Sequence, residues 1–404
     1  MKPPTSLQLG GPGDDDVLDV EVTGDLVIAA GYRNGILGQE NVEPVGNAAG
    51  FVDGYELDGR LRWHRSFDTS GADTVEAMVL TDTELAIAGR TSGVFPGAMN
   101  AGGMDAFVAR MRLDATDVPE VLMFGDDRPQ HPVRIARDST GALLVAGYDD
   151  THVVGGAVIA AEDPLVTRVR TDAATLALDF FRRPGTAGDD VYEGLVAPGP
   201  AGEVIVSGRA TAGADKGTFV RRLDATGAVV WQHMFSTTGV DAITALAFGP
   251  DGYVYATGTT FAAIAATSYG EQDVFVVALD PATGEIKRKM QGGSDKSDYP
   301  RDVVVAADGT VYVTGETAGT LPGATASGDY DAMALRFGPD DEWTGAWQRG
   351  TAGDDVGRSI AITPTGVVIG GYANGAFVPG AGHQGRRDGF VFHVARTELD
   401  LLGP

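Results

Sequence analysis

The chain has 404 residues, of which 56 are acidic and 30 are basic, so its formal net charge is −26. Nucleic acids and anionic membranes bind positive surfaces, and this charge therefore argues against both as partners. It suits cations or basic partners, or it serves only to keep the protein in solution. The absence of cysteine excludes disulfides, thiolate metal sites and cysteine nucleophiles.

Hydrophobic residues make up 43% of the chain, which is enough apolar surface for a folded core. No apolar run approaches the roughly 18 residues that span a membrane, so we expect no membrane insertion. The first residues, Met1–Pro4, lack the pattern of a signal peptide and resemble a linker remnant.

A short apolar strand that ends in glycine recurs along the chain. Its seven copies lie at 27–31, 85–89, 144–147, 204–208, 254–258, 311–315 and 367–371. Their last glycines are separated by 50 to 61 residues. A repeat of this length is typical of a propeller blade.

The neighbours of the repeated strand also recur. An apolar run and a tight turn such as Pro250–Gly252 precede it, which predicts a hairpin. A loop rich in glycine, alanine and threonine follows, and then a third strand that often opens with aspartate. A fourth strand carries Trp63, Trp231 and Trp347 at matching positions. Four antiparallel strands per repeat predict an all-β fold, a seven-bladed β-propeller.

The two ends of the chain are expected to meet in the last blade. The final repeat lacks a clear fourth strand, while residues 6–10 match the fourth strand at 346–350. An N-terminal strand that completes blade seven leaves no open sheet edge. We therefore predict a single domain over residues 1–404. Its blades span about 11–67, 68–125, 126–185, 186–236, 237–293, 294–350 and 351–404 plus 6–10.

This pattern resembles the SBBP-type repeat family of seven-bladed β-propellers in bacterial surface and secreted proteins. Blade six carries it most fully, in Gly309–Thr317, Leu321–Gly323 and Gly328–Ala332, and blade two carries it in Gly89–Gly97. The resemblance covers nearly the whole chain, and blades three and four depart from it most. It implies a secreted or cell-surface location but no common catalytic motif.

Loops between strands two and three, and between blades, are long and share one face, so we expect the function there. A first ring on this face is acidic. Its members are Asp14, Asp15, Asp16, Asp73, Asp126, Asp127, Asp189, Asp190, Asp241, Asp298, Asp354 and Asp355. Such carboxylates suit turns, where they bind their own backbone. The alternative is a Ca²⁺ site formed by Asp15, Asp16, Asp190 and Asp355, although no D-x-D-x-D-G loop is present.

A second ring follows strand two of each blade: Tyr32, Arg90, Tyr148, Arg209, Thr259, Glu316 and Tyr372. A third opens the strand that lines the channel: Asp19, Glu76, Arg134, Glu193, Thr244, Arg301 and Arg358. The second ring suits either ligand recognition or packing between loops. The third suits either a zwitterionic or carboxylated ligand, or an ion-pair network in the channel mouth.

Catalytic patterns are weak, because the six histidines lack metal-ligand spacing and no G-x-S-x-G motif occurs. The first hypothesis is a non-enzymatic binding module of a secreted or cell-surface bacterial protein. It would act as a monomer, with a protein, small-molecule or carbohydrate ligand on the long-loop face and no required cofactor. The alternatives are a metal-dependent hydrolase or lyase at the channel mouth, and a purely structural repeat domain.

Overall fold

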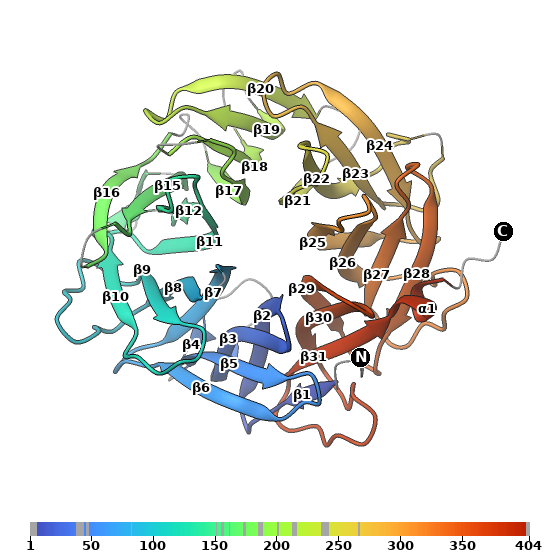
Figure 1. The fold of residues 1–404 in the computed structure, drawn as a ribbon, viewed down its shortest axis with the longest axis horizontal. Coiled ribbons are helices and arrows are strands. Elements are labelled where there is room, and N and C mark those ends of the chain that lie inside the picture. The colour runs from blue at the N-terminus through green and yellow to red at the C-terminus, as the bar shows by residue number, and fades with distance from the viewer. Residues whose placement is uncertain are drawn as a thin grey trace.

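Seven blades surround a central channel in the computed structural model (Figure 1). The structure describes residues 6–37, 44–45, 48–81, 83–150, 152–154, 157–160, 162–172, 175–184, 189–199, 202–211, 216–235, 242–265 and 267–400. This arrangement confirms the predicted all-β propeller.

The first three blades each contain four antiparallel strands in chain order from the channel outward. Blade one comprises β2 (Asp14–Thr23), β3 (Leu26–Leu37), β5 (Ala49–Glu56) and β6 (Leu61–Phe67), with β4 (Pro44–Val45) paired to β3. Blade two comprises β7 (Asp73–Leu80), β8 (Glu84–Thr91), β9 (Asp105–Arg112) and β10 (Glu120–Phe124). Blade three comprises β11 (Gln130–Arg137), β12 (Leu143–Asp149), β15 (Asp163–Arg170) and β16 (Ala177–Arg182). Its long loop adds the hairpin β13 (His152–Val154) and β14 (Ala157–Ala160).

The next three blades repeat this order. Blade four comprises β17 (Asp190–Val196), β18 (Val204–Ala210), β19 (Gly217–Leu223) and β20 (Val229–Phe235). Blade five comprises β21 (Ala242–Phe248), β22 (Val254–Thr260), β23 (Asp273–Leu279) and β24 (Ile286–Gly292). Blade six comprises β25 (Asp298–Val305), β26 (Val311–Thr317), β27 (Asp331–Phe337) and β28 (Trp343–Arg349).

Blade seven is built from both ends of the chain. Its sheet contains β29 (Asp355–Thr363), β30 (Gly366–Ala373), β31 (Asp388–Ala395) and, as the outer strand, β1 (Leu7–Leu9). β1 runs antiparallel to β31, with Leu7 opposite Val391. This confirms the predicted closure by the N-terminal strand. The short helix α1 (Arg396–Leu399) follows β31, and no helix of the described chain is long and apolar enough to cross a membrane.

A polar side chain on β1 also fastens this closure. The Gln8 amide donates to the Asp388 carboxylate and to the Gly375 carbonyl, both at 2.9 Å. Its oxygen accepts N–H bonds from Phe377 and Val378 at 2.9 and 3.1 Å. The first strand therefore holds the long loop of the last blade as well as its sheet edge.

The core is divided among the junctions between blades. Each of the seven junctions contains its own buried apolar cluster, because successive strand residues point to opposite faces. In β3, Ile28 and Ala30 pack against blade two, while Val27 and Ala29 pack against blade seven. This explains why the repeated strands are apolar on both sides.

Each innermost strand is irregular at the same point, near its start. One residue bulges out of the ladder with strand two: Leu18, Glu76, Val133, Glu193, Thr244, Arg301 and Arg358. The last glycine of each repeat lies beside this bulge. A Cβ on it would be 1.8 to 2.2 Å from a carbonyl oxygen of the innermost strand. The repeated glycine is therefore needed to let the two backbones approach.

The channel as the candidate functional site

A pocket of about 250 Å³ lies in the channel mouth, where the innermost strands leave the long inter-blade loops. Its wall consists of the seven bulged residues together with Arg134: Leu18, Glu76, Val133, Arg134, Glu193, Thr244, Arg301 and Arg358. The bulges turn one side chain per blade into the channel. The chemistry of this pocket is therefore set by one residue per blade, plus one arginine.

The second and third sequence rings pair within blades. Glu76 accepts from Arg90 at 2.9 Å in blade two, and Glu193 lies 3.9 Å from Arg209 in blade four. These pairs form because strand two places its residue beside the bulge. They agree with the ion-pair alternative for part of the ring.

Blades six and seven reverse this arrangement, with arginine on the channel strand. Arg301 Nε lies 3.1 and 3.0 Å from the two carboxylate oxygens of Glu316, and this partner raises the pKa of Arg301. Arg358 lies 3.4 Å from a carboxylate oxygen of Asp16 and 5.2 Å from the ring centre of Tyr372. Burial raises the pKa of Asp16, although Arg358 acts against it.

The tyrosines of the second ring lie in strands rather than in loops. Tyr32 and Tyr372 are buried, with 5% and 4% of their surface exposed, and burial raises the pKa of Tyr372 to about 12. Tyr148 stacks on His131 with ring centres 4.7 Å apart. This geometry favours packing for Tyr32 and Tyr372.

His131 connects blade two with the long loop of blade three. Its Nδ1 lies 2.5 Å from an Arg90 nitrogen, and its Nε2 lies 3.0 Å from an Asp150 carboxylate oxygen. Because guanidinium only donates, Nδ1 is the acceptor, and the Nε2 edge of the ring faces Asp150. His131 is thus occupied by a bridging role beside the mouth.

A second layer of the channel lies one residue beyond the bulges. It is formed by Asp19, Ala77, Arg134, Gly194, Ala245, Asp302 and Ser359. Asp19, predicted as a member of the mouth ring, belongs to this deeper layer, whereas Arg134 belongs to it and also lines the mouth pocket, as predicted. Leu18 and Val133 are the bulged residues of these two strands, because the sequence pattern does not reveal which residue of a strand bulges.

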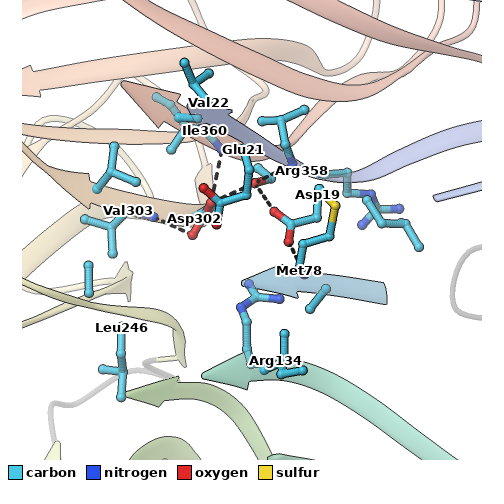
Figure 2. A pocket seen from close by; sticks show the side chains of 18 of the residues that line it. Asp19, Glu21, Val22, Met78, Arg134, Leu246, Asp302, Val303, Arg358 and Ile360 are labelled. Carbon is cyan, nitrogen blue, oxygen red and sulfur yellow. Dashed lines mark hydrogen bonds between the residues drawn. The ribbon is translucent and has the colours of Figure 1, made fainter. Parts of the chain in front are cut away.

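The deeper layer surrounds a cavity of about 390 Å³, and Leu18, Arg134 and Arg358 line both this cavity and the mouth pocket. Figure 2 shows the carboxylates of Asp19 and Asp302 and the guanidinium of Arg134 in the same space. Arg134 reaches from β11 to the carbonyl of Arg301 on β25, at 3.2 Å. It therefore crosses the channel between the two spaces.

Three residues of this layer form a belt across blades six, seven, one and two. Each accepts the backbone N–H of the next blade. These pairs are Asp302 with Ile360 at 3.0 Å, Ser359 with Val20 at 3.3 Å, and Asp19 with Met78 at 2.6 Å. The belt ties together the junctions on both sides of the chain closure.

The hydrogen bonds among Asp19, Ser359 and Asp302 require one proton more than the Ser359 hydroxyl supplies. Ser359 Oγ lies 2.7 Å from Asp19 Oδ1 and 3.1 Å from Asp302 Oδ2, yet a hydroxyl has one proton to donate. Asp302 also accepts N–H bonds from Val303 and Ile360, so it is the better carboxylate. Asp19 is therefore the carboxyl that keeps its proton and donates it to Ser359.

The electrostatics act on both members of this pair: burial also raises the pKa of Asp302, and the charge of Arg134 acts against that rise. Burial raises the pKa of Asp19 to about 7, and the nearby charge of Asp302 adds to the shift. Burial likewise raises the pKa of Glu21, which lines the same cavity, and repulsion from Asp19 and Asp302 acts in the same direction. The cavity is therefore less negative than its three carboxyl groups suggest.

The acidic loop ring has a different role. Asp15, Asp73 and Asp298 accept the backbone N–H of the residue four positions earlier at 2.5, 2.7 and 2.7 Å, and Asp355 does the same with Thr351. These bonds stabilise the inter-blade turns.

The members proposed for Ca²⁺ lie on three blades. Asp16 faces Arg358, and Asp190 is buried at the start of β17. Asp241, a member of the wider acidic ring that was not proposed for Ca²⁺, lies outside the described residues. Across the described ranges, no group of three or more histidine, aspartate or glutamate residues has an arrangement that holds a metal ion. The geometry therefore provides no ligand set for Ca²⁺ there.

Comparisons with known proteins do not identify a family for this chain. A scan of protein-family models finds no match, and a search of curated proteins finds no similar sequence. Sqt1 from Chaetomium thermophilum is 10% identical, with a TM-score of 0.47, 89% of this chain and 80% of that chain covered. A protein of unknown function from Dyadobacter fermentans is 11% identical, with a TM-score of 0.45, 96% of this chain and 98% of that chain covered. The Hadza microbial sialidase Hz136 is 11% identical, with a TM-score of 0.46, 74% of this chain and 63% of that chain covered. At these values none of them assigns a function.

Proposed function

We propose that this protein is a non-enzymatic binding module whose small ligand enters the channel from the long-loop face. The supporting observation is the mouth pocket of about 250 Å³, built by one bulged side chain from each blade. Ligand sites combine a concave wall with a few polar groups, and this pocket has both. Proteins remain candidate partners for the surrounding loops.

The proposed setting is a secreted or cell-surface bacterial protein of the SBBP-type repeat family. Its support is the repeated sequence, above all Gly309–Thr317 and Leu321–Gly323 in blade six. The enzyme alternative gains no support, since a metal-dependent hydrolase needs a ligand set that the described residues do not form.

A plugged channel tests the binding function. Thr244→Trp places a large ring in the mouth pocket, whereas Val230→Trp adds the same ring on an outer strand, where Val230 is 54% exposed. Melting temperatures of the native protein and both variants are measured with a panel of neutral sugars, sugar acids, amino acids and simple carboxylates. A ligand at about 100 times its Kd stabilises a protein by about 2.7 kcal/mol.

We expect at least one compound to raise the melting temperature of the native protein and of Val230→Trp but not of Thr244→Trp. If no compound separates the two variants, the channel is not a ligand site.

A further inference from the structure

Three arginines from distant parts of the chain meet at the mouth pocket. Arg134, Arg301 and Arg358 come from blades three, six and seven, and all three line the pocket. Arg134 donates to the Arg301 carbonyl at 3.2 Å, and Arg358 lies close enough to Arg301 for its charge to oppose protonation there. A positive cluster of this kind stands out in a chain of net charge −26.

The three guanidinium groups keep donors for a ligand. Arg301 binds Glu316 through Nε and Nη2, yet 41% of its side chain remains exposed. Arg358 has a single 3.4 Å contact with Asp16, made through Nε. Since a guanidinium has five N–H donors, both have donors left over.

Within the described part of the chain, Arg134 forms no salt bridge with a carboxylate, although its charge acts against the rise that burial causes in the pKa of Asp302. Its guanidinium donates only to two backbone carbonyls, those of Val133 at 3.1 Å and of Arg301 at 3.2 Å. In contrast, the mouth carboxylate of Glu76 is already held by Arg90 at 2.9 Å. The arginine without a salt bridge is therefore the one that crosses the channel.

The other residues that line the mouth pocket indicate the chemistry of an anion that these arginines would bind. Leu18 and Val133 give the pocket two apolar side chains, which suit carbon atoms rather than a bare inorganic ion. Below Arg134, the Asp302 carboxylate opposes deeper entry of negative charge. An anion would therefore stop at the level of the arginines.

We propose that the mouth pocket binds a small organic carboxylate. Its oxygen atoms accept N–H bonds from Arg134, Arg301 and Arg358, in the bidentate geometry that guanidinium favours, and its carbon skeleton contacts Leu18 and Val133. This inference rests on the proposed binding function and adds the chemical class of the ligand.

Calorimetric titration with matched compounds tests it. The carboxylates are acetate, lactate, succinate, benzoate and D-glucuronate, the neutral counterparts include lactamide, benzamide and D-glucose, and inorganic phosphate tests for a general oxyanion site. The proteins are native, Arg134→Met, which keeps an apolar stem, Arg134→Lys, and the control Arg62→Met on the outer strand β6. Circular dichroism and melting temperature establish that each variant is folded.

At least one carboxylate is expected to bind with a Kd below about 1 mM, and its neutral counterpart at least tenfold more weakly. Arg134→Met should weaken that binding by about tenfold or more, Arg134→Lys by less, and Arg62→Met not at all. The proposal is wrong if no carboxylate binds, if phosphate binds as tightly, or if Arg134→Met binds like the native protein. A neutral compound that binds at the mouth instead, and is blocked by Thr244→Trp, would keep the binding function and reject only the carboxylate.

Discussion

The ring can be divided into two arcs whose inner strands join neighbouring blades through different side chains. The seam arc comprises blades six, seven, one and two, whose inner strands are β25, β29, β2 and β7. The far arc comprises blades three, four and five, with β11, β17 and β21. In the seam arc, Asp302, Ser359 and Asp19 accept N–H bonds from the next blade. In the far arc the same layer holds Arg134, Gly194 and Ala245, which offer no side-chain oxygen.

The long loops do not follow this division into arcs, since one side-chain pair is shared by blade five of the far arc and blades six and seven of the seam arc. In blades five, six and seven, a glutamine on the outer strand binds the aspartate that opens strand three, as Gln348 binds Asp331 at 2.7 Å. In blade three, Asp163 is held by Arg128 at 2.6 Å instead. In blade four, strand three opens with Gly217, and Met234 occupies the place of the glutamine.

This comparison separates the features that every blade shares from the features that depend on a blade's position in the ring. The bulge and its glycine occur in all seven blades, so they belong to the repeat itself. The belt spans the junctions beside the chain closure, where two chain ends must be held together. The far arc has no chain ends to hold together, and its arginine, Arg134, lines the channel instead.

Substitution of the repeated glycine should give the largest effect, and it should be equal in the two arcs. Gly315→Ala in blade six and Gly208→Ala in blade four each place a Cβ 1.9 Å from a carbonyl oxygen of the inner strand. We expect each to lower the free energy of unfolding by about 4 kcal/mol or to prevent folding. Urea unfolding followed by circular dichroism measures this loss.

Gly382→Ala is the control, because its Cβ would have no atom within 4 Å and the change should be nearly neutral. Tolerance of alanine at residue 208 but not at residue 315 would show that the bulge is a property of the seam arc, contrary to our interpretation.

Much of the fold could be predicted because its causes are local and repeated. The spacing of the glycines, the alternating apolar residues and the tight turns occur seven times, and each repetition supports the others. The closure could also be predicted, since residues 6–10 and 346–350 share one pattern.

The site was harder to predict, because a bulge shifts the register by one residue without any mark in the sequence. Asp19 was placed one layer too high for this reason, and Leu18 and Val133 were missed, whereas Arg134 does line the mouth pocket. Asp302 is next to Arg301 in the sequence, so it could have been considered. Its contact with Asp19, however, is made through Ser359, which belongs to another blade. Such contacts arise only when the ring closes.

Removal of a loop glutamine should give an intermediate loss that is confined to blades with the aspartate–glutamine pair. Gln348→Met gives blade six the residue of blade four. It removes bonds to Leu321, Gly319 and the buried Asp331 of 2.8, 2.9 and 2.7 Å. We expect the free energy of unfolding to fall by about 3 kcal/mol, since buried polar groups lose their partners.

The reciprocal change, Met234→Gln, should not stabilise blade four, which has Gly217 where blade six has Asp331. Chemical unfolding of both variants makes the comparison. A loss below about 1 kcal/mol for Gln348→Met, or a gain for Met234→Gln, would contradict the pairing that we describe.

The belt predicts a smaller, pH-dependent effect. In the folded protein Asp19 keeps its proton up to a pKa of about 7, against an ordinary value of 3.8. Its contribution to stability is therefore complete below about pH 4 and is lost as the pH rises through about 7. Because an asparagine amide can replace the proton donor to Ser359 and its oxygen can still accept from Met78, Asp19→Asn should remove this loss.

We expect Asp19→Asn to exceed the native protein in unfolding free energy by about 2 kcal/mol at pH 8 and to match it near pH 4. Asp302→Asn should instead destabilise at both pH values, because the oxygens of Asp302 accept N–H bonds from Val303 and Ile360 and an amide nitrogen cannot. If the two variants have the same pH profile, the proton is not held on Asp19. A gain at pH 8 for Asp19→Asn, together with a loss at both pH values for Asp302→Asn, would place the proton on Asp19.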